Sequence, residues 1–215
     1  MPKKFHNELN QLKNDLLKMG SLVEDTIHDS VKSLKEQDLN LADEVIARDD
    51  RIDDLEIELK EKCTKLIALQ QPVAKDLRTI LVISEILTDL ERVGDYCCNI
   101  AYMVKEIGHE ALMKPLIDIP RMTELATERL KKSLDAFVEN DSNLAKKVAR
   151  SDEKIDEIDE QIFRELITYM IEDPGSIKQA SALIFISRFL ERIGDHSTNI
   201  CEGVIYMISG KREAY

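Results

Sequence analysis

The stretch that decides the fold reads Leu90-Glu91-Arg92-Val93-Gly94-Asp95, and it recurs 100 residues later as Leu190-Glu191-Arg192-Ile193-Gly194-Asp195. Further matches follow the same order along the chain: Asp38–Ala42 with Asp141–Ala145 and Asp49–Asp53 with Asp152–Asp156, both at a spacing of 103 residues, and Asn99-Ile100 with Asn199-Ile200. One such match could arise by chance. Four in order indicate a duplicated unit.

Working outward from this stretch, we predict three helices in the first copy. Apolar residues near the start recur at steps of three and four, which is the helical period, at Phe5, Leu9, Leu12, Leu16, Met19 and Val23. The first helix therefore covers residues 3–36. Asp38 is the predicted N-cap of a second helix that ends near residue 69, before Pro72, because proline cannot continue the hydrogen-bond ladder. A third helix covers residues 73–107 and stops at Gly108.

The second copy repeats this plan, with helices predicted over residues 121–139, 142–172 and 175–209. Pro115 and Pro120 mark the link between the copies, and Asp173-Pro174-Gly175 marks the last turn. Short turns between long helices favour antiparallel neighbours. We therefore predict an all-α protein of two tandem, pseudo-symmetric three-helix bundles, with domains at residues 1–112 and 113–215.

Composition narrows the class of protein. The net charge of −12 argues against non-specific binding to a nucleic-acid backbone. The four cysteines show no CxxC spacing, and Cys97 and Cys98 are adjacent, so they predict reduced thiols in a cytoplasmic protein rather than a zinc motif or a disulfide framework. The polar start of the chain does not resemble a signal peptide, and no segment is apolar over the length needed to span a bilayer.

The repeated segments carry four pairs of carboxylates, and each pair is spaced i,i+4 so that both members share one helix face. One such pair alone is weak evidence, because an acidic chain has many on solvated faces. The candidate residues are Asp49, Asp53, Glu91, Asp95, Asp152, Asp156, Glu191 and Asp195.

The turns give these pairs more weight. Asp53 and Glu91 are equally far from Pro72, as are Asp49 and Asp95, and the second copy repeats this relation about the Asp173-Pro174 turn. In an antiparallel hairpin the two members of each such equidistant pair therefore lie at the same height, and the four carboxylates of each copy lie roughly 30 Å from the turn. If the faces meet, four clustered carboxylates require a cation or protons. Such oxygen-rich sites suit hard divalent ions, iron or manganese.

Neighbouring residues leave alternatives open. Asn99 and Asn199 extend the acidic stripe by one turn, and His196, where the first copy has Tyr96, is a candidate extra ligand. Gly94 and Gly194 lie inside helices, which indicates close approach of a backbone or ligand, or a tight helix contact. The alternative to a metal site is that both groups of carboxylates are exposed and simply retained from the ancestral unit.

The motifs at 90–96 and 190–200, with Met19-Gly20 and both Asp-x-x-Ile-Asp segments, resemble the PhoU family over nearly the whole chain. The resemblance implies a PhoU-like pair of three-helix bundles and a cytoplasmic negative regulator of phosphate uptake and of the phosphate regulon. It implies as partners the phosphate ABC transporter, chiefly its ATPase subunit, and the phosphate-sensing histidine kinase. We also predict a homodimer, because amphipathic helices can dimerise, and a protein that is at most peripheral to the membrane.

In some members the family's E(D)xxxD motifs bind multinuclear metal clusters, and they match this chain at the eight carboxylates named above. The resemblance implies iron first, with zinc, manganese or magnesium as alternatives. Two other functions stay open. A di-iron enzyme of the ferritin-like kind would need Glu-x-x-His motifs, which the repeated sites lack, and would turn over oxygen. A purely structural scaffold would hold no metal and would tolerate alanine at the carboxylates.

Overall fold

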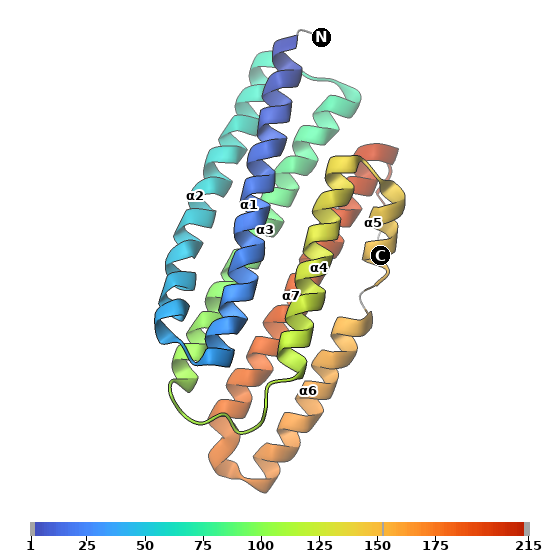
Figure 1. Cartoon of the computed structure of the whole chain (residues 1–215). Helices are drawn as coiled ribbons and strands as arrows, with labels where there is room; N and C mark the ends of the chain where they lie inside the picture. Colours follow the sequence, from blue (N-terminus) through green and yellow to red (C-terminus); the bar gives the residue numbers. More distant parts are fainter. Residues whose placement is uncertain (1–2, 152, 213–215) are drawn as a thin grey trace.

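The computed structural model describes residues 3–151 and 153–212, and all secondary structure in that part is helical. The first bundle consists of α1 (Lys3–Glu36), α2 (Leu39–Gln70) and α3 (Ala74–Ile107). The second consists of α4 (Asp118–Glu139), α5 (Ser142–Ala149), α6 (Glu153–Glu172) and α7 (Ile177–Ser209), with a short 3-10 turn at Pro174–Ser176. Figure 1 shows two elongated bundles side by side, with α3 next to α7. The predicted fold class is confirmed, whereas the domain boundary at residue 112 stays a prediction.

The predicted helices of the first copy agree with the structure to within about one residue at each end. The apolar stripe of α1 is buried from Phe5 to Val23. Asp38 caps α2 by accepting hydrogen bonds from the backbone N–H of Asn40 (3.0 Å) and Leu41 (3.1 Å). Gly108 ends α3 with φ of 65°, a conformation that favours glycine.

The prediction of one helix over residues 142–172 is wrong, because the chain breaks between α5 and α6. Ser151 closes a tight local turn there. Its backbone N–H lies 3.0 Å from the Val148 carbonyl oxygen, and its hydroxyl donates to the same oxygen at 2.7 Å. A serine hydroxyl that bonds the preceding turn competes with the helical ladder. The first copy has Arg48 at the equivalent position, and α2 is continuous.

The second copy also begins earlier than predicted. Helix α4 starts at Asp118 rather than Arg121, so Pro120 lies inside its first turn. Proline is tolerated there because the first backbone N–H groups of a helix have no intrahelical partner. The link before α4 is held at both ends: Gln37 donates to the carbonyl oxygens of Gly108 and Glu110, and Gln179 accepts from the backbone of Met113.

One hydrophobic core runs through both bundles. Helices α3 and α7 are antiparallel, since Val82 lies against Gly203 and Tyr96 against Phe189, in opposite order along the two helices (Figure 1). A Cβ atom at Gly203 would lie 3.3 Å from Val82 Cγ1, so the helices approach closely. All four cysteines are buried, free thiols, as the sequence predicts.

The α3–α7 contact is pseudo-symmetric in position but not in chemistry. Asp89 Oδ1 lies 2.9 Å from His196 Nδ1 on one side of it. The equivalent positions, 100 residues away in each case, hold Phe189 and Tyr96, whose rings stack with centroids 5.9 Å apart. The contact is therefore polar on one side of its centre and aromatic on the other.

The cap of α2 gives a first test. Replacing Asp38 by Ala leaves two backbone N–H groups without their acceptor, so we expect the free energy of unfolding to fall by about 1 kcal/mol. Asp38→Asn keeps a capping oxygen and should change the free energy of unfolding by only about 0.3 kcal/mol. Urea denaturation of both variants measures the difference. Equal stability of the two variants would contradict the cap.

Candidate functional site

The structure brings the four carboxylates of the first copy together between α2 and α3. We call Asp49, Asp53, Glu91 and Asp95 the first patch. All four side chains are partly buried, with Glu91 at 17% and Asp95 at 36% relative exposure. They converge because the i,i+4 pairs lie at equal distances from the turn and both helices turn that face inward. Across this hairpin, Asp95 of α3 lies near enough to Asp49 of α2 to affect its pKa. Asp53 of α2 likewise affects the pKa of Glu91 of α3, as the sequence predicts.

Electrostatics in the first patch disfavour ionisation. Burial raises the pKa of Asp49 to about 6, and the charges of Asp53 and Asp95 add to this rise, while a contact with the Cys98 thiol opposes it. Burial and the neighbouring carboxylates also raise the pKa of Asp53 and of Glu91. One oxygen on each of Asp49, Asp53 and Glu91 is buried without a hydrogen-bond partner. Such oxygens call for protons or a cation.

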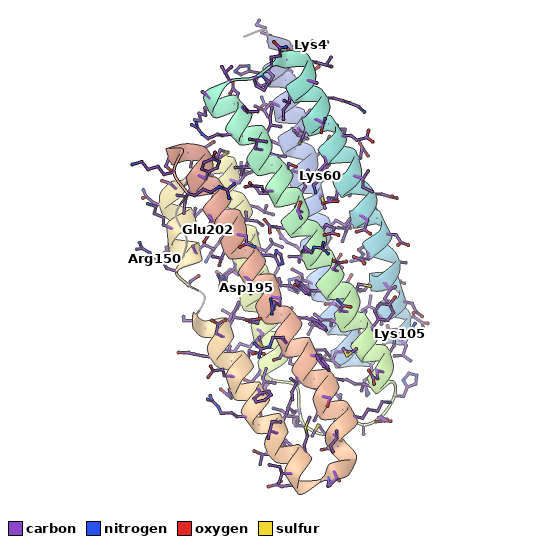
Figure 2. All side chains as sticks on the ribbon, turned by 180° about the vertical axis from the view of Figure 1, so that it is seen from behind. Lys4, Lys60, Lys105, Arg150, Asp195 and Glu202 are labelled. Atoms are coloured by element: carbon purple, nitrogen blue, oxygen red, sulfur yellow. The ribbon has the colours of Figure 1, made fainter. Side chains whose placement is uncertain are left out.

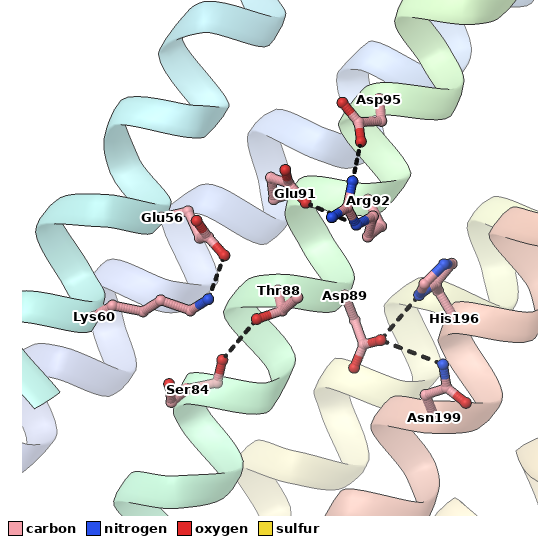
Figure 3. A network of polar contacts seen from close by, with 10 residues as sticks. All are labelled: Glu56, Lys60, Ser84, Thr88, Asp89, Glu91, Arg92, Asp95, His196 and Asn199. Atoms are coloured by element: carbon pink, nitrogen blue, oxygen red, sulfur yellow. Dashed lines mark hydrogen bonds and ion pairs between the residues drawn. The ribbon is translucent and has the colours of Figure 1, made fainter.

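The side chain of Arg92 supplies a nearby positive charge. Its Nη1 donates to Asp95 Oδ2 at 2.7 Å, and its Nε lies 3.5 Å from Glu91 Oε2, as Figure 3 shows. Arg92 is 54% exposed, so solvent screens these pairs and they compensate the buried oxygens only in part.

The glycine inside α3 is explained by close packing in this patch. A Cβ atom at Gly94 would lie 3.0 Å from Asp49 Oδ1 and 3.2 Å from Ile52 side-chain carbons. The tight helix contact that the sequence left as one of two readings is therefore present. Gly94 lets α2 approach α3 closely enough to bring the carboxylates together.

In the second copy the equivalent residues are Asp152, Asp156, Glu191 and Asp195, which we call the second patch. Asp152 lies outside the described residues. Burial and the charge of Asp195 raise the pKa of Asp156 and of Glu191, so these three carboxylates are close to one another. Asp195 lies midway along α7, as Figure 2 shows. Glu191 Oε2 is buried without a hydrogen bond.

Two acids that the sequence analysis missed extend the patches. Glu56 adds to the rise in the pKa of Asp53 and Glu91, and it pairs with Lys60 at 2.5 Å. Its equivalent, Asp159, is buried and accepts a hydrogen bond from Ser187. Both acids lie three residues after a patch carboxylate and 103 residues apart, so the repeat itself could have identified them.

The structure places two of the other candidates, His196 and Asn199, elsewhere, whereas the role of Asn99 stays a prediction. His196 contacts Asp89 of α3 at 2.9 Å, and Asn199 donates to the same carboxylate at 3.4 Å (Figure 3). Both side chains therefore join the two bundles rather than extend a carboxylate patch. The exposed Arg192 lies 3.7 Å from the partly buried Glu191, which parallels the pair of Arg92 and Glu91.

The residues of the first patch fit a hard cation by donor type, since all are carboxylates and three have an orphaned buried oxygen. Their present rotamers do not form a closed cage: in residues 3–151 and 153–212, no group of three or more His, Cys, Asp or Glu side chains is placed to hold a metal ion. Arg92 holds Asp95 in an ion pair, so a cation would have to compete with that contact.

This duplicated architecture matches a known family. The model of the PhoU domain matches residues 16–104 and again residues 119–204, one match in each bundle. The chain belongs to the PhoU family. A PhoU homolog of Clostridium acetobutylicum, named a phosphate-specific transport system accessory protein, is 41% identical over 209 residues, which cover 97% of this chain and 95% of that protein. The Escherichia coli PhoU protein is 36% identical over 96% of this chain and 86% of its own length.

Solved PhoU structures share the fold. The crystal structure of PhoU from Pseudomonas aeruginosa superposes with a TM-score of 0.92 at 38% identity, covering 96% of this chain and all of that one. The regulatory protein PhoU of the phosphate transport system from Streptococcus pneumoniae gives a TM-score of 0.91 at 29% identity, covering 98% of this chain and 100% of that one.

The raised pKa of Asp49 predicts how stability changes with pH. Its folded-state pKa of about 6 exceeds the ordinary value of 3.8, so the folded state disfavours the ionised form and stability falls as pH rises between these values. Asp49→Asn should stabilise the chain by about 1–2 kcal/mol near pH 7.5, less than the full shift implies because the group is partly exposed, and by almost nothing near pH 4.

Urea denaturation at both pH values, in buffer with a metal chelator, measures this effect. Asp54→Asn is the matched control, because Asp54 is an exposed acid on the same helix. An Asp49→Asn variant that is no more stable than the wild type near neutral pH would contradict the unfavourable ionisation.

Proposed function

We propose that this chain is a negative regulator of phosphate uptake and of the phosphate regulon. It acts in the cytoplasm as a non-enzymatic adaptor between the phosphate ABC transporter and the sensor histidine kinase. The observation that carries this proposal is the PhoU family match in both bundles, supported by near full-length relatives that are named accessory proteins of a phosphate-specific transport system.

The proposed partners are the ATPase subunit of the transporter and the phosphate-sensing kinase, and the proposed assembly is a homodimer. In the described part of the chain, no helix is both long and apolar enough to cross a membrane. An adaptor of this kind would meet the transporter through its cytoplasmic subunit, with peripheral contact to the membrane at most.

Metal binding at the carboxylate patches is the second part of the proposal. The first patch supplies the best donors, since Asp49, Asp53 and Glu91 each have a buried oxygen without a hydrogen bond and the charge of Asp53 adds to the rise in the pKa of the other two. A multinuclear cluster, with iron first and zinc, manganese or magnesium as alternatives, would neutralise these carboxylates and hold α2 against α3. The residues themselves orient the donors, and Gly94 sets the distance between the helices.

Deletion of the gene should raise expression of a phosphate-regulon reporter several-fold in cells grown at high phosphate, because repression is lost. Complementation with the wild-type gene should restore repression. A variant carrying Glu91→Gln and Asp95→Asn should restore it less well, whereas Glu44→Gln, at an exposed position of α2, should restore it fully. Unchanged reporter expression in the deletion strain would overturn the regulatory role.

Elemental analysis of protein purified without a metal-affinity tag tests metal binding directly. We expect bound transition metal in the wild type and a loss of about 10-fold or more in its affinity after Glu91→Gln, because a donor in the shared set is removed. The Glu44→Gln variant should retain the wild-type content. Wild-type protein without stoichiometric metal, even after incubation with Fe²⁺ or Mn²⁺, would refute this part of the proposal.

A further inference from the structure

The two patches differ in the cations built around them. One arginine stands at a different position in each copy. Three pairs of equivalent positions show this difference: Thr26 with Arg129, Arg48 with Ser151, and Cys98 with Thr198. The pairs in the first two helices of each copy follow the spacing of 103 residues, and the last follows the spacing of 100. The arginine has thus moved from the second helix of the first copy to the first helix of the second copy.

In the first copy the arginine is used away from the patch. Arg48 Nη2 lies 2.9 Å from Asp29 Oδ2 on α1, and Arg48 Nη1 lies 3.5 Å from the Thr26 hydroxyl. At the position facing the patch, Cys98 offers a neutral thiol to Asp49. The cation in direct contact with first-patch carboxylates is the exposed Arg92.

In the second copy a buried arginine faces the patch. Arg129 of α4 is 5% exposed, and its Nη2 donates to the Thr198 hydroxyl at 2.7 Å, one turn beyond Asp195. The charges of Asp156 and Asp195 act on Arg129, and the guanidinium in turn opposes the rise in the pKa of Asp156. The second patch therefore has a positive charge within its own packing.

Two further differences between the copies also add positive charge near the second patch. Arg188 lies 3.1 Å from Asp159 and 3.8 Å from Glu191, where the first copy has Thr88. Beside Arg129, a surface hollow of about 330 Å³ is lined by more cations than acids; the charged residues that line it are Glu128, Arg129, Lys132, Arg150 and Lys154. At the positions of Lys132 and Arg150, the first copy has Asp29 and Ala47.

We propose that Arg129 is a built-in counter-cation that takes, at the second patch, the place of a bound metal, so that this chain binds metal tightly at the first patch only. An arginine stays protonated at all physiological pH values, and at short range its charge repels a divalent ion. This inference rests on the metal binding proposed for the first patch, and it assigns the two patches different roles.

Titration with Mn²⁺, with free Mn²⁺ read by electron paramagnetic resonance, tests the inference. Asp53→Asn with Glu91→Gln should abolish tight binding, whereas the equivalent pair Asp156→Asn with Glu191→Gln should leave it intact. Arg129→Gln should tighten binding at the second patch by about 10-fold. Two control variants should not tighten Mn²⁺ binding. Arg129→Lys keeps the positive charge, and Lys132→Gln removes an exposed charge that is paired with Glu128. Equal loss of tight Mn²⁺ from both patch variants would overturn the inference.

A metal-free measurement separates this inference from the proposed metal binding. In chelator, Asp156→Asn should raise the equilibrium for folding about fivefold more in the Arg129→Gln background than in the wild type, because the counter-cation is gone. If Arg129→Gln alone prevents folding, adding Asp156→Asn and Asp195→Asn should restore it. Absence of coupling or of rescue would overturn the counter-cation. Coupling without any Mn²⁺ binding would support the counter-cation and refute only the metal proposal.

Discussion

The close antiparallel packing of α3 against α7 is the contact on which the other features depend. Each of these helices packs both within its own bundle and against the other, so the two bundles share one hydrophobic core. Helix α3 packs against α1 and α2 as well as α7, and the first patch lies where it meets α2. The second patch lies at the equivalent contact of α7 with α6.

Burial of like charges on such a face is costly, and the protein shows two ways of meeting the cost. The first patch leaves carboxylate oxygens without hydrogen bonds and raises the pKa of their groups. The second also leaves a Glu191 oxygen without a hydrogen bond and raises the pKa of Asp156 and Glu191. It differs in having two arginines nearby: Arg129, which donates to Thr198, and Arg188, which pairs with Asp159. The duplicated backbone thus holds one patch whose contacting arginine, Arg92, is exposed and one patch that has the buried Arg129 in its packing, while the pKa of carboxylates is raised in both.

Features that depend on helical periodicity, capping residues and distance from a turn could be predicted. Features that depend on one side chain competing with the backbone, or on how the two bundles are placed against each other, could not. The stripe of α1, the Asp38 cap and the Gly108 stop follow from periodicity and turn chemistry. The alignment of Asp49, Asp53, Glu91 and Asp95 follows from their distance to a proline turn. The break at Ser151 depends on one hydroxyl that competes with the backbone for a carbonyl oxygen. It was not predicted, because the equivalent helix of the first copy, α2, is continuous there. The pairing of His196 with Asp89 required the position of α7 along α3, which no sequence spacing defines.

The unequal chemistry of the α3–α7 contact limits how the halves can assemble. In an isologous dimer of two identical units, each residue meets its partner twice, once on either side of the axis. A dimer of the first unit alone would set Asp89 against Tyr96 at both ends, and a dimer of the second alone would set Phe189 against His196. Neither reproduces the ion pair or the ring stack. The halves have become complementary to each other rather than to themselves, so the covalent link now fixes which unit meets which.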